Sequence, residues 1–466
     1  MGDQAYAPRM PRHWLLLPLL LASPAPADDL KVTLRDTSSL TLRNCSDTSG
    51  AIRFAAAGDD AARFVRSATR GDGTPLARDG GAYVARDWHA GECATFTIDA
   101  RAIAARRDED RGYALGADLL LSPHAFLWQA GDAPPRVTFE LADDLEVATP
   151  WRPLDAFPHR RFQVRETPRH WPALVAVGAF AARDVAAGAG TLRVALPGVD
   201  DAAASATLLR FAGEVANDVA TTFRAAFAAS PQLLVVPTGR SSRAVTFGQT
   251  LRGGGTSVVL YVDAARPLAD YHADWTLTHE LVHLVHPYLG DDGRWIGEGV
   301  ATYYQNVIRA RAGHITPRQA WRALDAGFGR GRANPSTLTL RETSRRMDRG
   351  LYMRAYWSGT AIALAGDVAL RTRATPASLD RAIAGALDCC RERGRRDARL
   401  WLATLDSSVG GDVLARAHDV VVDGTAFPDV AAAYAALGLE RHGDELHFSA
   451  EPAAVALRTA IMGGDD

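Results

Sequence analysis

The sequence lacks several features that would place it in a common functional class. Beyond residue 28 it has no apolar segment long enough to cross a membrane. Its formal net charge is only −2, so electrostatics give no case for binding nucleic acid or an anionic membrane. Lysine is scarce, and there are neither internal repeats nor long low-complexity tracts. A hydrophobic content of 47% and a charged content of 23% are typical of a folded globular protein.

The N-terminus carries the layout of a secretory signal. A basic flank, Arg9 and Arg12, precedes the apolar run Trp14–Leu21, and the small residues 25–27 follow it. This order of charged, apolar and small residues is typical of a cleaved signal peptide. We therefore assign residues 1–27 as a signal peptide cleaved near Ala27. We expect the mature protein to be exported, periplasmic or secreted, without stable membrane insertion.

Cysteine is also scarce, with four residues in all and no CxxC pair. Export permits disulfides, and Cys45 and Cys93 both lie in the strand-rich N-terminal region, where they could pair. Cys389 and Cys390 are adjacent, and a bond between neighbours is strained, so we expect two reduced or separately engaged thiols. No cysteine lies near the histidine cluster described below, which argues against thiolate ligation of a metal.

The pattern along the chain predicts an α+β multidomain fold. At 466 residues the chain exceeds what one hydrophobic core supports. Residues 28–165 contain short β-prone segments separated by turn residues, the pattern of a β-sandwich. A proline-rich hinge at about 149–172 leads to a second domain of strands and helices at residues 173–310. Residues 311–466 are mainly helical, and strands before helices favour an α+β architecture.

The most informative motif is His279-Glu280-Leu281-Val282-His283, within a helix expected at about 274–286. Residues four apart lie on one face of a helix, so both imidazoles can reach one metal ion. Glu280 lies beside them, where it can take a proton from a metal-bound water. This HExxH arrangement is typical of zinc hydrolases, most of them peptidases.

A catalytic zinc site normally takes three protein ligands and leaves the fourth position for water. Glu298 follows a short turn in a helix expected at about 294–312, so it can reach the same ion. His286 is the rival, but it lies seven residues from His279, roughly 10 Å along a straight helix. We therefore predict one Zn²⁺ ion on His279, His283 and Glu298, with His286 packed or supporting the ligands.

Two segments of the chain resemble known zinc peptidases. HELVH followed by WIGEGVATYYQ resembles the gluzincins, the thermolysin-like clan whose zinc ligands are two His and one Glu. Within that clan the phrase W-x-x-E-G-x-x-x-Y-Y is most similar to the glycyl aminopeptidase family. Tyr356-Trp357-Ser358-Gly359 resembles the segment that carries a transition-state tyrosine in related aminopeptidases. Over about residues 170–420, the resemblance implies a thermolysin-like catalytic domain after the β-sandwich, with the helical C-terminal part completing the cleft.

The chain departs from the glycyl aminopeptidase pattern in several places. Only about 45 residues follow position 420, too few for the PDZ domain that often ends the family. The stretch from His283 to Glu298 is shorter than is usual in the clan, which implies a trimmed loop between the two helices. Ser358 replaces a lysine of the tyrosine segment.

A further departure concerns the strand that would hold the substrate. Aminopeptidases of this group carry a Glu after a glycine pair there, and it binds the free amine. The matching residues here are predicted to bind the peptide through backbone hydrogen bonds: Gly253, Gly254, Gly255 and Thr256. Because none of them is acidic, a substrate ammonium would lack a carboxylate partner. Exopeptidase and endopeptidase action therefore both stay open.

Together these features predict an exported zinc metallopeptidase acting on a peptide or an unfolded protein. Zinc would supply the Lewis acid, Glu280 the general base, and Tyr356 a donor to the oxyanion, with Tyr352 as the fallback. The alternative is a catalytically silent, zinc-containing peptide-binding or scaffold protein of the cell envelope. The missing acid favours this alternative, whereas the intact Glu280 opposes it. The oligomeric state is left open.

Overall fold

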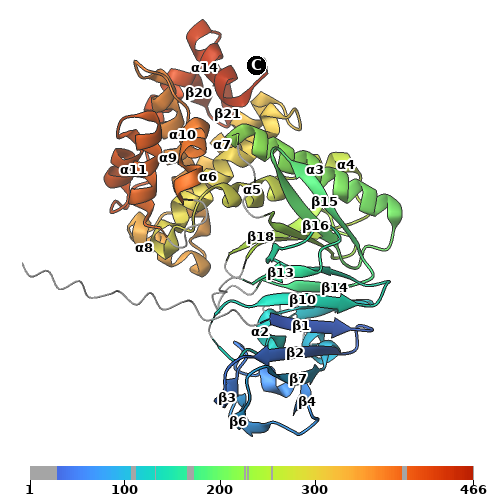
Figure 1. Ribbon diagram of the computed structural model, residues 1–466. Helices are drawn as coiled ribbons and strands as arrows, with labels where there is room; N and C mark the ends of the chain where they lie inside the picture. Colours follow the sequence, from blue (N-terminus) through green and yellow to red (C-terminus); the bar gives the residue numbers. More distant parts are fainter. Residues whose placement is uncertain are drawn as a thin grey trace, which may run out of the picture.

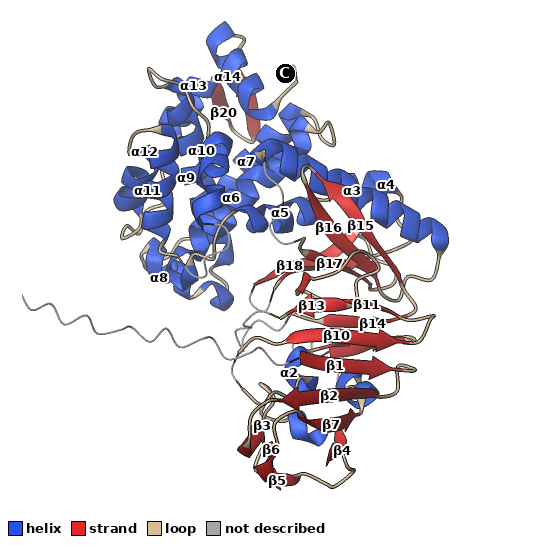
Figure 2. Ribbon diagram, in the orientation of Figure 1, coloured by secondary structure: helices blue, strands red, loops and turns tan. Residues whose placement is uncertain are grey.

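The computed structural model describes residues 29–464, except for short stretches at 106–111, 132, 165–172, 225–226, 228–229, 253–254 and 391–395. The assigned signal peptide therefore lies outside the described residues. Strands dominate the first part of the chain and helices the last (Figures 1 and 2), which confirms the α+β prediction. Among the described helices, none is long and apolar enough to span a membrane.

In the described residues of the N-terminal part, the chain forms fourteen strands and three short helical segments. The strands are β1 (Asp29–Leu34), β2 (Leu40–Ser46), β3 (Gly50–Phe54), β4 (Val65–Arg70), β5 (Ala77–Asp79), β6 (Ala82–Trp88), β7 (Glu92–Ile98), β8 (Gly112–Leu115), β9 (Asp118–Leu121), β10 (Arg136–Leu141), β11 (Glu146–Ala148), β12 (Arg152–Pro153), β13 (Arg161–Gln163) and β14 (Val175–Gly178). The helical segments are η1 (Ala61–Arg63), α1 (Ala100–Ala104) and α2 (Pro123–Phe126). The strands form sheets with the orders β12-β13-β10-β1-β2-β7-β4, β11-β14-β9-β8 and β3-β6-β5.

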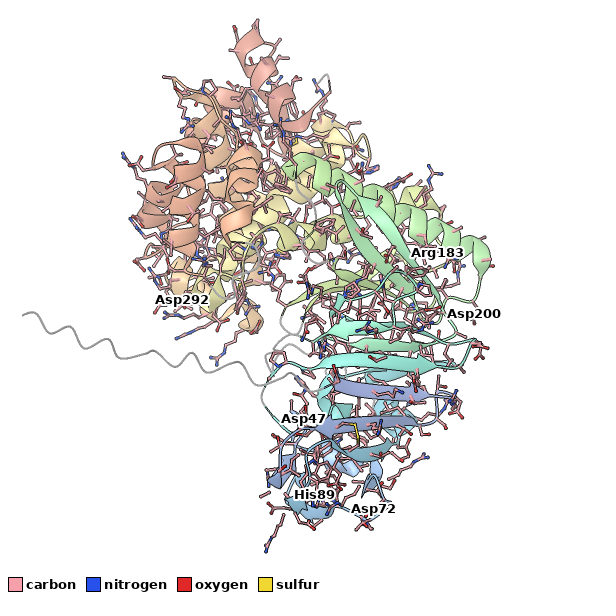
Figure 3. All side chains as sticks on the ribbon, in the orientation of Figure 1. Asp47, Asp72, His89, Arg183, Asp200 and Asp292 are labelled. Atoms are coloured by element: carbon pink, nitrogen blue, oxygen red, sulfur yellow. A yellow bond between two sulfur atoms is a disulfide. The ribbon has the colours of Figure 1, made fainter. Side chains whose placement is uncertain are left out.

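One hydrophobic core joins these three sheets. The alternation along β2 shows why: Leu40, Leu42 and Asn44 are buried while Thr41 and Arg43 between them are not, as a half-covered strand requires. Cys45 in β2 lies directly opposite Cys93 in β7, and the two form a disulfide, seen as a yellow bond in Figure 3. This confirms the predicted candidate pair.

One strand lies close to the predicted boundary between the first two domains. The sequence places Val175–Gly178 in the catalytic domain, but this strand, β14, pairs with β11 and β9 of the N-terminal part. The reason is its burial: all four residues of β14 are buried, which suits a strand covered on both faces rather than a domain edge. Cys389 and Cys390 end helix α10 (Leu379–Cys390), and their side chains lie outside the described part.

A second, mixed sheet has the order β15-β16-β17-β19-β18. Its strands are β15 (Ala181–Ala187), β16 (Gly190–Leu196), β17 (Gln232–Pro237), β18 (Val245–Arg252) and β19 (Thr256–Val262), and helix α3 (Ala202–Phe223) packs on one face. Alternate residues face opposite sides: Leu233 and Val235 pack with the helices, whereas Leu234 and Val236 pack toward β9 and β14. The sheet thus connects the N-terminal part to the helices.

The remaining chain is helical except for the hairpin β20 (Leu439–His442) and β21 (Glu445–Phe448). The helices are α4 (Leu268–Ala273), α5 (Thr276–Val282), η2 (His283–Val285), α6 (Gly290–Arg311), α7 (Pro317–Arg332), α8 (Leu340–Arg345), η3 (Met347–Arg349), α9 (Tyr352–Thr372), α10, α11 (Ala398–Val409), α12 (Val413–Val421), α13 (Ala431–Leu437) and α14 (Pro452–Met462). Helix α6 lies between α5 and α9 in the interior of this part (Figure 1).

Helices α6 and α9 approach so closely that only glycine fits at their contact. A Cβ on Gly299 would lie 2.3 Å from Cα of Gly359, and a Cβ on Gly359 would lie 1.9 Å from the carbonyl oxygen of Trp295. Gly299 follows Glu298 in α6, and Gly359 lies one helical turn after Tyr356 in α9. The contact therefore sets the distance between the predicted third ligand and the predicted oxyanion donor.

Candidate active site and metal centre

The three predicted metal ligands come together from α5, η2 and α6. His279 Nε2 lies 3.2 Å from His283 Nε2, and Oε2 of Glu298 lies 3.2 Å from each of these nitrogens. Three atoms this far apart could all bind one ion at the Zn–N and Zn–O distances of about 2.0–2.2 Å. Two imidazoles and one carboxylate are also the donor types of a catalytic zinc. The site fits the predicted ion.

Hydrogen bonds to the far side of each imidazole leave its Nε2 free for a metal. Nδ1 of His279 lies 2.9 Å from Oε1 of Gln305, an oxygen that can only accept, so Nδ1 carries the hydrogen. Nδ1 of His283 lies 3.1 Å from Nε2 of His286, whose own Nδ1 donates to the carbonyl of Pro287 over 2.8 Å. Because that carbonyl only accepts, the chain of bonds fixes both tautomers.

His286 is therefore brought beside the ligands without being one of them, in agreement with the sequence argument. Helix α5 gives way to η2 and then to an extended backbone at His286, because Pro287 disfavours a helical residue before it. The His286 ring packs against Trp401, and a Cβ on Gly297 would lie 3.1 Å from its Cε1. Burial keeps the pKa of His286 well below its usual value, so the ring is a neutral acceptor.

Glu298 is held as a carboxylate. Burial by itself raises the pKa of Glu298, but when Nε2 of His283 and of His279 carry protons in place of a metal, the charge of His283 and the hydrogen bonds from both rings outweigh burial and keep the pKa well below its usual value. An ionised carboxylate is the form that binds a metal cation. The stretch between His283 and Glu298 is shorter than is usual in the clan, but it does not prevent Glu298 from reaching the two histidines.

Glu280 is buried and receives a hydrogen bond that the sequence did not predict. Oγ1 of Thr250 lies 2.8 Å from Oε2 of Glu280 and also 2.8 Å from its carbonyl oxygen. On the same strand, β18, a Cβ on Gly248 would lie 3.0 Å from Cγ of Glu280. Gly248 and Thr250 thus face α5. The period of two along Val245–Arg252 was the available signal, but nothing in the sequence showed which helix that face would meet.

The structure distinguishes between the two candidate tyrosines. The ring of Tyr356 lies 5.9 Å from the ring of His279, centroid to centroid, and nearly parallel to it. Burial, with the charges of Glu298 and Glu280, raises the pKa of Tyr356 well above its usual value, so its hydroxyl stays protonated. Tyr352 is 50% exposed and contacts the outer side of Tyr356. Tyr356 is therefore the tyrosine next to the ligands.

The predicted substrate strand does not have a free edge. Thr256 opens β19, which is hydrogen-bonded to β17 on one side and to β18 on the other, so it cannot also pair with a peptide. Gly255 has a positive φ, and a Cβ there would lie 1.7 Å from the carbonyl oxygen of Pro150. A glycine is therefore required at this position by backbone conformation and packing. Gly253 and Gly254 lie outside the described residues. The edge strand beside α5 is β18.

A partly buried cation on β18 also went unnoticed in the sequence. Arg252 donates a hydrogen bond to the carbonyl of His283, at the end of the motif helix. Burial lowers the pKa of Arg252 to about 10, and the nearby charges of Glu298 and Glu280 oppose that shift. The guanidinium is still protonated at neutral pH, so the strand that faces the site carries a positive charge there and no acid.

Solved structures share this architecture. The aminopeptidase N family protein from Idiomarina loihiensis is 13% identical with a TM-score of 0.60, over 88% of this chain and 78% of that one. An M1 zinc metallopeptidase from Deinococcus radiodurans is 14% identical with a TM-score of 0.49, over 86% and 94% respectively. No protein-family model and no curated protein matches the sequence. At this identity the first likeness establishes the fold alone: the chain shares the fold of an aminopeptidase N family protein.

Proposed function

We propose that the protein is a zinc metallopeptidase that hydrolyses peptide bonds with a metal-activated water and Glu280 as the general base. The observation that carries this proposal is the triangle of Nε2, Nε2 and Oε2 atoms with 3.2 Å edges, next to the buried Glu280. Structural zinc sites usually close the fourth position with another Cys or His. Among the described residues, the metal-ligand cluster contains only His279, His283 and Glu298.

The side chains around the triangle then have separate roles. Bound there, zinc would supply a Lewis acid and lower the pKa of a coordinated water. Glu280 takes a proton from the attacking water and delivers it to the leaving amine. The Thr250 hydroxyl holds the Glu280 carboxylate in place. Tyr356, protonated at neutral pH, donates a hydrogen bond to the oxyanion that develops on the scissile carbonyl.

The peptide would lie along the outer edge of β18. An extended chain can add to a free sheet edge by backbone hydrogen bonds, and Gly248 and Thr250 bring this edge next to Glu280. Arg252 on the same strand would repel a substrate ammonium rather than bind it. We therefore expect an activity that does not require a free N-terminal amine.

We also propose that the protein works outside the cytoplasm. The support is the signal-like sequence at residues 1–27 together with the disulfide between Cys45 and Cys93. Disulfides persist in oxidising compartments and are rare in the cytosol. Fractionation of cells that produce the full-length chain, with N-terminal sequencing of the mature protein, tests this point. A chain that stays in the cytosol with residues 1–27 intact contradicts it.

The function is tested by Glu280→Gln, with Glu445→Gln on the exposed hairpin as the matched control. Glu280→Gln should keep one zinc per chain, measured by elemental analysis, but lose about 10²–10⁴-fold in kcat/KM on an unstructured peptide library. Glu445→Gln should match the wild type in both. A zinc-loaded Glu280→Gln protein that cleaves at the wild-type rate would contradict the proposed role of Glu280 as the general base. A zinc-loaded wild type that binds the peptides but cleaves none supports the catalytically silent alternative.

A further inference from the structure

A cavity of about 420 Å³ opens beside the proposed active site. It is lined by Arg294, Met347, Asp348, Gly350, Tyr352 and Tyr356. Tyr356 links it to the metal ligands, because the same ring that lines the cavity lies against His279. Arg294 lies in α6 one helical turn before Glu298, so its side chain starts from the same face. A substrate residue next to the reacting bond can therefore enter this cavity.

Arg294 has hydrogen-bonding capacity left over. Its Nη2 lies 3.3 Å from Oδ1 of Asp348, and among the described residues this is its only hydrogen-bonded or ion-paired partner. A guanidinium has five N–H donors. The Asp348 side chain is 79% exposed, and such exposed ion pairs contribute little free energy because water competes for both partners. Arg294 can exchange this contact for a substrate carboxylate without breaking a buried pair.

The segment that closes the cavity adds positive charge. Arg346 and Arg349 flank the lining residues Met347 and Asp348; both are exposed, and within the described chain neither has an ion-pair partner. The neighbouring Arg345 is different, because it is paired with Asp292, which is labelled beside α8 in Figure 3. Together with Arg294, Arg346 and Arg349 outnumber Asp348, the acidic residue among the lining residues, and an excess of one charge around a cleft attracts ligands of the opposite sign. Here the excess favours an acidic peptide.

We propose that this cavity is a substrate subsite in which Arg294 binds a carboxylate, so that the enzyme prefers peptides with a carboxylate close to the scissile bond. The proposal rests on the proposed peptidase function and names the substrate class of the same site. A planar guanidinium can hold a carboxylate through two parallel hydrogen bonds. That carboxylate can come from an Asp or Glu side chain or from a free C-terminus, and peptide design separates these two sources.

The experiment uses the zinc-loaded mature protein and one neutral peptide scaffold. Each position is replaced in turn by Glu, Gln or Lys, and every peptide is made with a C-terminal acid and with a C-terminal amide. We expect kcat/KM to be about tenfold higher for the best Glu peptide than for its Gln partner, or for the acid than for the amide. The position at which the preference appears identifies the source.

Variants of the cavity then test the assignment. Arg294→Gln should abolish the preference, Arg294→Lys should keep part of it, and Asp348→Asn should increase it by freeing the guanidinium. The control is Arg416→Gln on α12, where an equally charged residue is 72% exposed and, among the described residues, forms an ion pair only with Asp412 at the start of that helix. It should keep the wild-type preference. The same peptides are also titrated against the zinc-loaded Glu280→Gln protein by fluorescence anisotropy, which measures binding without turnover.

The outcomes separate this proposal from the proposed function. Zinc-dependent cleavage and binding without any preference for a carboxylate overturn the subsite, as does an Arg294→Gln protein that keeps the preference. A preference for Lys that Asp348→Asn removes also overturns it, because Asp348 is then the recognition group. If no peptide is cleaved but the carboxylate peptides bind about tenfold more tightly, the subsite stands and the proposed catalysis fails.

Discussion

At the scale of the residue, the site depends on groups that hold the ligands and the base rather than on the ligands alone. Gln305 accepts a hydrogen bond from Nδ1 of His279, and His286 accepts one from Nδ1 of His283. Both histidines can therefore offer Nε2 to a metal. Glu280 is held in turn by Thr250. Such supporting hydrogen bonds fix ring orientation and tautomer, and their loss typically costs 10–100-fold in metal affinity or activity.

His286→Phe should weaken zinc binding by about 10–100-fold, because Nδ1 of His283 then loses its acceptor. His286→Gln should lose less, since its amide oxygen can still accept that hydrogen. Competition with a chelator of known affinity measures both changes without relying on activity. A His286→Phe protein that binds zinc as tightly as the wild type would show that the ring serves only packing.

Thr250→Val, which keeps the shape but removes the hydroxyl, should lower kcat by about tenfold or more. Zinc content should not change, because Thr250 does not touch a ligand, and KM should change little, because the backbone of β18 is unaltered. Thr250→Ser should restore most of the rate. Steady-state kinetics measure kcat and KM, and metal analysis measures the zinc content. An equal loss of kcat in Thr250→Val and Thr250→Ser would contradict a role for the hydroxyl.

At the scale of the element, helix packing positions Tyr356, the proposed oxyanion donor. Gly299 and Gly359 let α6 and α9 meet at backbone distance, which brings Tyr356 against His279. The sequence predicted a helix at about 294–312, which is close to the observed bounds of α6, Gly290–Arg311; α9 packs against this helix. The sequence could not show that these two helices touch through glycine, because that depends on their relative orientation.

Gly359→Ala should destabilise the protein by at least about 2 kcal/mol, since its methyl group has no space beside the Trp295 carbonyl. The matched control is Gly329→Ala in α7, where a Cβ meets only Arg441 Nη1 at an ordinary 3.7 Å. That change should be neutral or slightly stabilising, because alanine favours a helix. Urea unfolding of both variants measures the difference, and equal stabilities would contradict the close contact.

The strand that faces the site illustrates a limit of sequence analysis. Gly253–Thr256 was predicted to bind substrate because a glycine pair marked it in the resemblance, yet β19 is paired on both sides. The sheet order is decided by which strands find partners far along the chain, and alternation within one strand carries no information about that. The HExxH motif could be recognised from the sequence, because the spacing of its two histidines along a helix is a local property.

At the scale of the whole molecule, one disulfide stabilises the N-terminal part while the metal site lies in the helical part. Cys45 and Cys93 are separated by 48 positions in sequence and lie opposite each other in neighbouring strands. Cross-linking residues this far apart restricts the unfolded chain, which in the chain-entropy model is worth about 4 kcal/mol.

The double variant Cys45→Ser/Cys93→Ser should therefore lose about 3–4 kcal/mol of unfolding free energy in the N-terminal part. Zinc binding should remain at low denaturant, because no ligand contacts either cysteine. Urea titrations that follow the tryptophan signal and zinc release in parallel check both statements. Zinc release at the same lowered urea concentration as N-terminal unfolding would show that the two parts unfold together.

By itself, the sequence determined the α+β order of elements, the candidate disulfide pair, the HExxH motif and the candidate for its third ligand, because each follows from local spacing or residue chemistry. Only the tertiary structure decided the position of β18 beside α5, the contact of Thr250 with Glu280, the place of Tyr356 rather than Tyr352 next to His279, and the cavity around Arg294. These depend on which surfaces meet once distant segments pack, and packing is a property of the whole chain rather than of any one segment.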